Sequence, residues 1–170
     1  MKIAVLGYSG SGKSTLAVRL GELYGLPVLH LDRVQFLEGW RERGLAEKKR
    51  IVADFMRDNN GWVIDGNYSN LFRAERLEQA DMIILMLFNR FVCLKRAYSR
   101  YRRYKGMTRP DMGEGCPEKL DSEFIRWILH NGRTRSKKAG YKAICRKYPD
   151  KVTILKSQRE LDNFLQRLEK

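Results

Sequence analysis

A glycine-rich segment near the start of the chain has the residue types and the spacing needed to hold phosphate groups. Residues 7–14, the glycine loop, read GYSGSGKS and fit the pattern G-x-x-x-x-G-K-[ST]. Glycines let successive backbone N–H groups curl around an anion, and a following helix adds partial positive charge. Lys13 would bring a full charge to the terminal phosphates of ATP, and the Ser14 hydroxyl would bind Mg²⁺. The alternative is a glycine-rich turn without a ligand. The residues predicted to bind ATP are Gly7, Tyr8, Ser9, Gly10, Ser11, Gly12, Lys13, Ser14 and Thr15.

Two aspartates follow predicted strands, at the strand ends where ligands bind in open parallel sheets. Asp65 comes directly after the apolar run 62–64, and we expect it to complete the Mg²⁺ site. Its alternative role is to cap the Gly66-Asn67 turn. Asp32 follows the run 29–31, and it could bind a substrate hydroxyl and accept the proton of that hydroxyl. It could equally cap a turn, and both interpretations stay open.

Arginine and lysine are concentrated in residues 90–149, which hold 17 basic and 5 acidic residues, a net charge of +12. The whole chain carries +14. A local surplus of this size predicts a polyanionic partner, either nucleotide phosphates or nucleic acid, whereas a solvated helix face is the alternative. We expect Lys13, Asp32, Arg96, Arg100 and Arg133 to be the catalytic residues. A basic lid is expected at about residues 100–135. A guanidinium contacts two phosphate oxygens at once, which suits a transferring phosphate.

The hydrophobic pattern predicts elements that would position these residues. Short apolar runs predict five strands, at residues 2–6, 27–31, 62–64, 82–88 and 152–155. Amphipathic spacing predicts helices that start at residue 13 and that span 45–57, 71–79, 91–105, 161–168 and, as one or two helices, 121–148. The glycines and prolines of residues 106–117 predict a loop. Strands that alternate with helices imply an α/β fold with a parallel sheet covered on both faces.

Length and composition limit the class of protein. A chain of 170 residues fits one domain, and we expect a single domain over residues 1–170. The longest apolar run, 82–88, is far shorter than the ~20 residues of a membrane helix, so no membrane partner is expected. The first seven residues break into glycine before a secretory segment could form, which predicts a cytoplasmic location. Three scattered cysteines, Cys93, Cys116 and Cys145, are expected to be free thiols.

These motifs together resemble the P-loop nucleoside monophosphate kinases, such as adenylate and shikimate kinases. The chain is more closely similar to the bacterial DNA topology modulation (FlaR-related) proteins within that group. The likeness runs to about Arg135. The segments that carry it are 7–15, 29–32, 62–68, 89–90 and 108–118.

The resemblance implies a three-layer P-loop NTPase fold with strand order 2-3-1-4-5 and ATP bound at Gly7 to Ser14. It also implies that Arg96 and Arg100 contact the donor nucleotide, and that Arg133 or Arg135 contacts the phosphates. The chain departs from adenylate kinases after the third strand, where residues 65–70 read DGNYSN instead of Asp-Gly-Phe-Pro-Arg. The missing arginine holds the acceptor phosphate in those enzymes.

Two functions follow as hypotheses. The first is an ATP-dependent kinase that transfers the γ-phosphate to an unidentified small-molecule acceptor, nucleoside-like or another hydroxyl compound. The second is a nucleotide-regulated protein that associates with DNA. The sequence leaves the acceptor open, because Phe36, Trp40 and Tyr68 could stack on a base or pack under a loop.

Overall fold

A five-stranded parallel sheet forms the centre of the fold, as the sequence predicts. The structure is a computed structural model that describes residues 1–169, and Lys170, the last residue of the predicted single domain, lies outside the described residues. In spatial order the strands are β2 (Val28–His30), β5 (Trp62–Asp65), β1 (Lys2–Gly7), β6 (Met82–Met86) and β7 (Val152–Leu155). All neighbours in this sheet pair in parallel, so their carboxyl ends meet at one edge.

The strand order is β2-β5-β1-β6-β7 when every strand of the chain is numbered. The expected order was 2-3-1-4-5, and the two notations differ because the chain contains a further pair of strands that the sequence pattern did not reveal. The additional strands, β3 (Phe36–Leu37) and β4 (Arg41–Glu42), form a separate two-stranded antiparallel sheet. The three-residue 3₁₀ helix η1 (Glu38–Trp40) connects them. We call residues 36–42 the hairpin.

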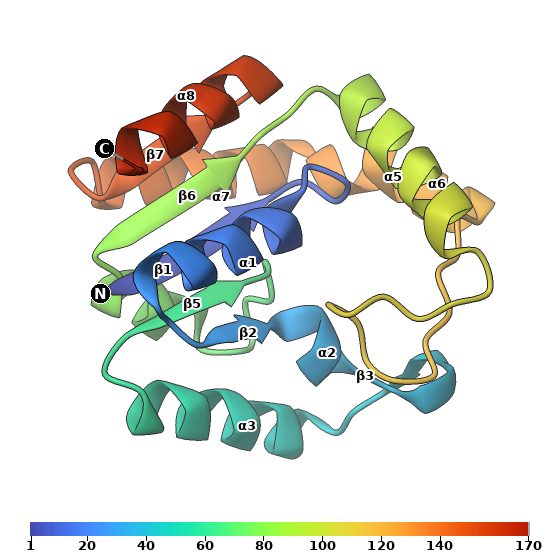
Figure 1. The fold of residues 1–170 in the computed structure, drawn as a ribbon, viewed down its shortest axis with the longest axis horizontal. Coiled ribbons are helices and arrows are strands. Elements are labelled where there is room, and N and C mark those ends of the chain that lie inside the picture. The colour runs from blue at the N-terminus through green and yellow to red at the C-terminus, as the bar shows by residue number, and fades with distance from the viewer. Residues whose placement is uncertain (170) are drawn as a thin grey trace.

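Helices cover both faces of the parallel sheet, because side chains alternate between two hydrophobic cores along each strand. On β1, Ile3 and Val5 belong to one core, while Ala4 and Leu6 belong to the other. The helices α1 (Lys13–Tyr24) and α8 (Gln158–Leu168) pack in the first core. The second core takes in α3 (Leu45–Asp58), α4 (Arg73–Gln79) and α7 (Arg135–Lys147). Figure 1 shows the resulting three layers.

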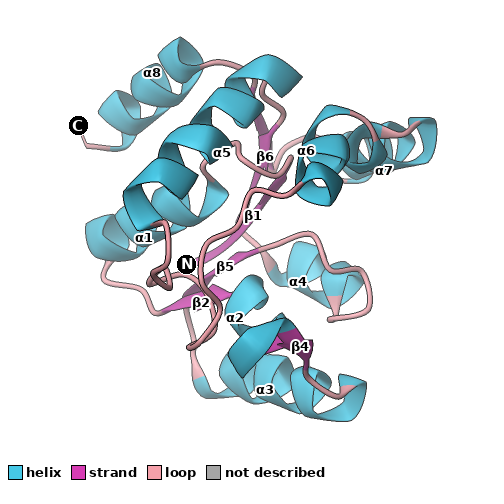
Figure 2. Cartoon of the chain, turned by 90° about the vertical axis from the view of Figure 1, so that its right-hand side faces the viewer, coloured by secondary structure: helices cyan, strands magenta, loops and turns pink. Residues whose placement is uncertain are grey.

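Two helices and a long loop extend beyond the carboxyl edge of the sheet. They are α5 (Arg90–Tyr104), α6 (Ser122–Leu129) and the intervening residues 105–121, which we call the lid loop. A short 3₁₀ helix, η2 (Asn131–Arg133), leads into α7. In Figure 1 the lid loop runs from the end of α5 toward the hairpin, and Figure 2 shows its irregular course between helices. This placement allows both segments to face the sheet edge.

The segment after β2 differs most from the expectation. The sequence predicts no element between residues 32 and 44, whereas the chain forms the short helix α2 (Leu31–Gln35) and then the hairpin. Elements this short leave too few residues for a 2-residue or 3.6-residue period to emerge. Elsewhere the predicted elements exist, with ends shifted by a few residues. For example, α4 begins at Arg73 rather than at residue 71.

The helices and the cysteines test two expectations from the composition. Among residues 1–169 no helix combines the length and the apolar character needed to cross a membrane. Cys93, Cys116 and Cys145 are free thiols, as predicted.

Candidate functional site

The glycine loop connects β1 to α1 at the carboxyl edge of the sheet. Gly10 has a φ of +78°, and a Cβ atom added there would lie 2.5 Å from the carbonyl oxygen of Cys93 in α5. Gly12 has a φ of +94° and is the N-cap of α1. Residues with a Cβ rarely adopt these conformations. Glycine at both positions therefore lets the loop turn directly into α1 while it packs against α5.

Polar side chains from distant elements hold the glycine loop in place. The amide of Asn67 donates to the carbonyl oxygen of Gly7 at 2.7 Å and accepts from the Gly7 N–H at 3.0 Å. From α5, Arg96 donates to the carbonyl oxygen of Ser11 at 2.5 Å. Neither contact is visible in the sequence pattern, because the partners lie 60 and 85 positions apart. The backbone of the loop is thus fixed before any ligand arrives.

Lys13 lies at the start of α1 and lines the cleft beside the glycine loop. Its ammonium group donates to the carbonyl oxygen of Tyr8 at 3.0 Å. Burial lowers the pKa of Lys13, and the negative charges of Asp32 and Asp65 partly offset this effect. Two carboxylates therefore support a charge that burial disfavours, and an anionic ligand would support it further.

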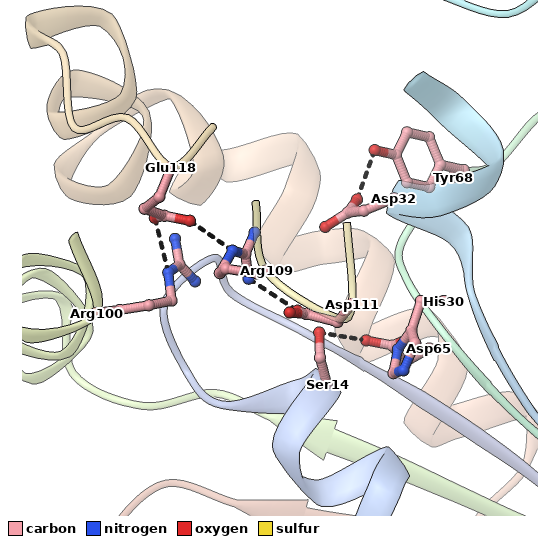
Figure 3. A network of polar contacts seen from close by, with 9 residues as sticks. All are labelled: Ser14, His30, Asp32, Asp65, Tyr68, Arg100, Arg109, Asp111 and Glu118. Atoms are coloured by element: carbon pink, nitrogen blue, oxygen red, sulfur yellow. Dashed lines mark hydrogen bonds and ion pairs between the residues drawn. The ribbon is translucent and has the colours of Figure 1, made fainter. Parts of the chain in front are cut away.

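Asp65 connects the glycine loop to two neighbouring strands, as Figure 3 shows. Its Oδ2 accepts a hydrogen bond from the Ser14 hydroxyl at 2.9 Å, and its Oδ1 lies 2.6 Å from Nδ1 of His30. Burial lowers the pKa of His30, but the hydrogen bond and the charge of Asp65 outweigh burial, so that this pKa is raised. Asp65 thus pairs with the loop and with β2 rather than capping the Gly66-Asn67 turn. The contact with His30 was not predicted.

Ser14 and Asp65, the two residues predicted to hold Mg²⁺, fit that role in their chemistry and position. Their oxygen atoms are 2.9 Å apart, and Mg²⁺ prefers oxygen ligands. Within residues 1–169 no three His, Cys, Asp or Glu side chains are placed to hold a metal ion. A pair of protein oxygen donors suits Mg²⁺, which usually keeps several waters and binds through one or two protein ligands and phosphate oxygens.

Asp32 enters the cleft from α2, directly after β2. Its Oδ1 accepts a hydrogen bond from the Tyr68 hydroxyl at 2.7 Å. Burial and the charge of Asp32 raise the pKa of Tyr68, so the hydroxyl keeps its proton and remains a donor. Among the described residues no donor binds Oδ2 of Asp32. Asp32 is thus held through Oδ1, while its Oδ2 has no donor among the described residues.

Two of the three predicted arginines reach the cleft. Arg96 lies against the glycine loop, where it also hydrogen-bonds the side chain of Gln158 and stacks on the ring of Phe88 at 4.4 Å. Arg100 lies one helical turn further along α5, and its Nε donates to Glu118 of the lid loop at 2.8 Å. The structure therefore places Arg96 and Arg100 on the same side of the cleft as the glycine loop.

Arg133 is used differently from the prediction. Its guanidinium donates to the carbonyl oxygens of Ile128 at 2.8 Å and Phe88 at 2.9 Å, and to the sulfur of Cys93 at 3.1 Å. It also stacks on the ring of Tyr8 at 3.7 Å, and it does not line the cleft. The catalytic role predicted for Arg133 does not fit this geometry, because the side chain is buried, does not line the cleft, and directs three of its five N–H groups at protein partners.

The lid loop docks on the hairpin through backbone contacts. Gly39 N–H donates to the carbonyl oxygen of Gly115 at 2.9 Å, and the thiol of Cys116 donates to that of Leu37 at 3.2 Å. The hairpin follows directly on α2, which carries Asp32. The lid loop, which carries Arg109, is therefore in contact with the hairpin, which directly follows the helix of Asp32.

The aromatic residues left open by the sequence pack with protein groups. Trp40 lies edge-to-face against Phe36, with ring centroids 5.2 Å apart, and its indole N–H donates to the carbonyl oxygen of Pro117 at 3.2 Å. Tyr68 is bound to Asp32. These contacts favour packing of Trp40 under the lid loop over the alternative of base stacking.

A single cleft of about 2500 Å³ joins these parts, with the glycine loop, α5, the lid loop and Asp32 among its walls. A site for one small molecule usually measures ~300–1000 Å³. The cleft therefore has room for a nucleotide together with a second small molecule.

Comparison with known proteins supports the fold alone. The chain matches no protein-family model and no curated protein. It is similar to the solved structure of an uncharacterized protein from Eubacterium ventriosum, with a TM-score of 0.53, 16% identity, and coverage of 99% of this chain and 98% of that chain. A structure from Thermus thermophilus is similar too, with a TM-score of 0.53, 16% identity, and coverage of 99% and 97%. Both likenesses span nearly the whole chain, so this arrangement of sheet and helices also occurs in other proteins.

Substitution of Gly10 by alanine should destabilise the fold. The new Cβ would meet the Cys93 carbonyl oxygen at 2.5 Å in a backbone conformation that alanine rarely adopts. We expect a loss of about 2–4 kcal/mol in the free energy of unfolding, measured by urea denaturation. Gly140→Ala, on an exposed stretch of α7 with nothing within 4 Å of the added Cβ, should be neutral or slightly stabilising. Equal stability of the two variants would contradict the loop geometry.

Substitution of Arg133 by leucine should act on stability. The change leaves two buried carbonyl oxygens without their donor, and we expect a loss of about 2–4 kcal/mol in the free energy of unfolding. The matched variant Arg135→Leu, two residues away and exposed, should change stability by less than about 0.5 kcal/mol. Thermal or urea unfolding of both variants measures the difference. A stable Arg133→Leu protein would show that the structural role is wrong.

Proposed function

We propose that the protein is an ATP-dependent phosphotransferase with a P-loop NTPase fold, which transfers the γ-phosphate of ATP to a hydroxyl group of a small-molecule acceptor. The observation that carries this proposal is the convergence of three parts on one cleft. These are the glycine loop with Lys13, the Ser14–Asp65 pair, and the carboxylate of Asp32. The chain's likeness to the DNA topology modulation (FlaR-related) branch of the P-loop kinases, carried by the segments named above, belongs to the same proposal.

On the donor side, the backbone N–H groups of residues 8–14 and the start of α1 would hold the ATP phosphates. Lys13 would exchange its hydrogen bond to the Tyr8 carbonyl for the β- and γ-phosphates. Ser14 and Asp65 would hold Mg²⁺, directly or through water, and the ion would neutralise phosphate charge. His30 keeps Asp65 oriented toward Ser14 through its contact at 2.6 Å.

On the acceptor side, the free Oδ2 of Asp32 would accept the hydrogen bond of the acceptor hydroxyl. In the transfer step a bond forms between the acceptor oxygen and the γ-phosphorus, while the bond to the β–γ bridging oxygen breaks. The hydroxyl proton passes to Asp32, and ADP leaves with the electron pair of the broken bond. Tyr68 holds Oδ1 throughout and so fixes the carboxylate in one orientation.

The arginines of α5 would act on the transferring group from the opposite side to Asp32. Figure 3 shows Arg100 and Asp32 approaching from different elements, α5 and α2. Arg96 would brace the glycine loop through Ser11, and Arg100 would contact phosphate oxygens. This division of roles leaves Arg133 as a structural residue. A cytoplasmic location accompanies the proposal, because ATP and free thiols both persist in a reducing cytoplasm.

The proposal predicts that the chain transfers phosphate from labelled ATP to at least one member of a panel of nucleosides, nucleoside monophosphates, sugars and small acids. Lys13→Ala should lower the rate by a factor of about 10² or more, because a preorganised positive charge at the phosphates is lost. Removal of Mg²⁺ with EDTA should abolish transfer. Lys49→Ala, on α3 away from the cleft, is the matched control and should keep the wild-type rate. Equal turnover by the Lys13 and Lys49 variants would overturn the proposal.

A second candidate function, association with DNA, is favoured by cations that the cleft does not use. Arg102, Lys138 and Lys142 are exposed on α5 and α7, and they form no ion pair among residues 1–169. If they bind duplex DNA, affinity should fall about 10³-fold or more between 50 and 200 mM salt, provided that many phosphates are contacted. Fluorescence anisotropy with a labelled duplex measures this dependence. No binding at 50 mM salt, or binding that salt does not change, would remove this candidate.

A further inference from the structure

Glu118, in the lid loop, contacts two arginines, Arg100 and Arg109, as Figure 3 shows. Arg100 donates from Nε to Oε1 of Glu118 at 2.8 Å, and Nε of Arg109 forms an ion pair with Oε2 at 2.5 Å. The side chain of Glu118 is only 2% exposed. A buried carboxylate with one arginine on each oxygen is an arrangement that the sequence pattern did not predict.

The two arginines keep donors for a ligand. Arg100 meets Glu118 through Nε, and among residues 1–169 neither Nη atom of Arg100 makes a hydrogen bond. The Nε of Arg109 is in ion-pair contact with Glu118 but makes no hydrogen bond, its Nη1 donates to Asp111 at 2.8 Å, and its Nη2 has no hydrogen-bond partner among the described residues. Both arginines line the cleft. Arg100 is held through Nε and keeps both Nη groups, whereas Arg109 is held through Nη1 and keeps Nη2. These Nη groups are donors suited to phosphate oxygens.

The charges of this network explain why it needs Glu118. Burial and the nearby charge of Arg109 lower the pKa of Arg100, while Glu118 raises it. Two guanidinium groups this close repel each other, and an anion between them offsets the repulsion. With Asp111 included, two positive charges face two negative charges, so the network is neutral as a whole. Removal of Glu118 would leave like charges together in a poorly solvated place.

The backbone places this network at the base of the lid loop. The Glu118 N–H donates to the carbonyl oxygen of Met107 at 2.9 Å, and Thr108 pairs with Pro117 across the loop. Every member of the network therefore lies between the end of α5 and the base of the loop, within residues 100–118. Both arginines and their acidic partners therefore belong to one continuous stretch of chain, and contacts within that stretch orient them.

We propose that Glu118 is a positioning residue, which preassembles Arg100 and Arg109 as a pair that contacts the terminal phosphates of a nucleoside triphosphate during transfer. The inference rests on the proposed function and adds Arg109 to the residues that contact the nucleotide. Because the pair is oriented before the ligand binds, little reorganisation is needed as charge develops on the transferring group. Glu118 itself touches no substrate.

The experiment compares Glu118→Gln with Glu114→Gln, an exposed glutamate of the same lid loop. Turnover of ATP is measured with the Lys13→Ala protein as the blank. We expect Glu118→Gln to lower kcat by about 30- to 100-fold with less than about a threefold change in KM for ATP, because the lost interaction belongs to the transition state. Glu114→Gln should match the wild type. Wild-type kcat in Glu118→Gln would overturn the inference and leave the proposed function intact.

A binding measurement separates positioning from a purely structural role. Calorimetry records the affinity for MgADP alone and for MgADP with aluminium fluoride, which mimics the transferring phosphate. Glu118→Gln should bind MgADP alone with an affinity within about threefold of the wild type. The increase in affinity that aluminium fluoride causes should be at least about tenfold smaller in Glu118→Gln than in the wild type. An equal loss in both affinities would contradict positioning.

Arg109→Lys provides a second variant if Glu118→Gln melts below the assay temperature. Lysine keeps the charge but lacks the planar fork that reaches Glu118, Asp111 and a phosphate together. We expect at least about a tenfold fall in kcat. A wild-type kcat in Arg109→Lys would overturn the inference. If the wild-type protein turned over ATP no faster than the Lys13→Ala protein, the proposed function would be overturned, and the inference with it.

Discussion

The carboxylate of Asp65 is the interaction on which the organisation of the cleft depends. It accepts from Ser14 at 2.9 Å on one oxygen and contacts His30 at 2.6 Å on the other, so it joins the end of β5 to the glycine loop and to β2. The parallel sheet makes this possible, because the carboxyl ends of its strands meet at one edge. Asp65 is 4% exposed, and a charge this buried requires both partners. Loss of either contact would loosen the geometry that brings Ser14 and Lys13 into the cleft.

Arginine serves two purposes around this edge, and burial of the guanidinium distinguishes them. Arg76 is 1% exposed and donates to the carbonyl oxygens of Leu71, Gly66 and Tyr68, which fixes the loop that carries Tyr68 and Asn67. Burial lowers the pKa of Arg76 to about 10. Arg133 supports the backbone in the same way. Arg100 is instead held by a side chain and keeps donors that face the cleft. Part of the basic surplus therefore stabilises irregular backbone, and only part is available to phosphates.

The sequence predicts those features that depend on local pattern. Apolar runs identify the five parallel strands, and the motif at residues 7–14 places a tight glycine-rich turn between β1 and α1. The same local pattern does not predict contacts between segments that are distant in the sequence. Asn67 with Gly7, His30 with Asp65, and Glu118 with Arg109 are specified by three-dimensional packing, which no periodicity reports. Arg133 shows the opposite failure, because a basic residue after a lid suggests phosphate binding, and only the positions of neighbouring carbonyl groups reveal its structural use.

We propose above all that the cleft holds the phosphates of ATP at the glycine loop and an acceptor at Asp32. A crystal structure with Mg²⁺ and a non-hydrolysable ATP analogue tests it most directly. We expect the β- and γ-phosphates within hydrogen-bond distance of Lys13 and of the loop N–H groups, and the metal ion beside Ser14 and Asp65. The γ-phosphate should face Asp32 from the side of α5. A nucleotide bound outside the glycine loop, or a γ-phosphate turned away from Asp32, would contradict this proposal.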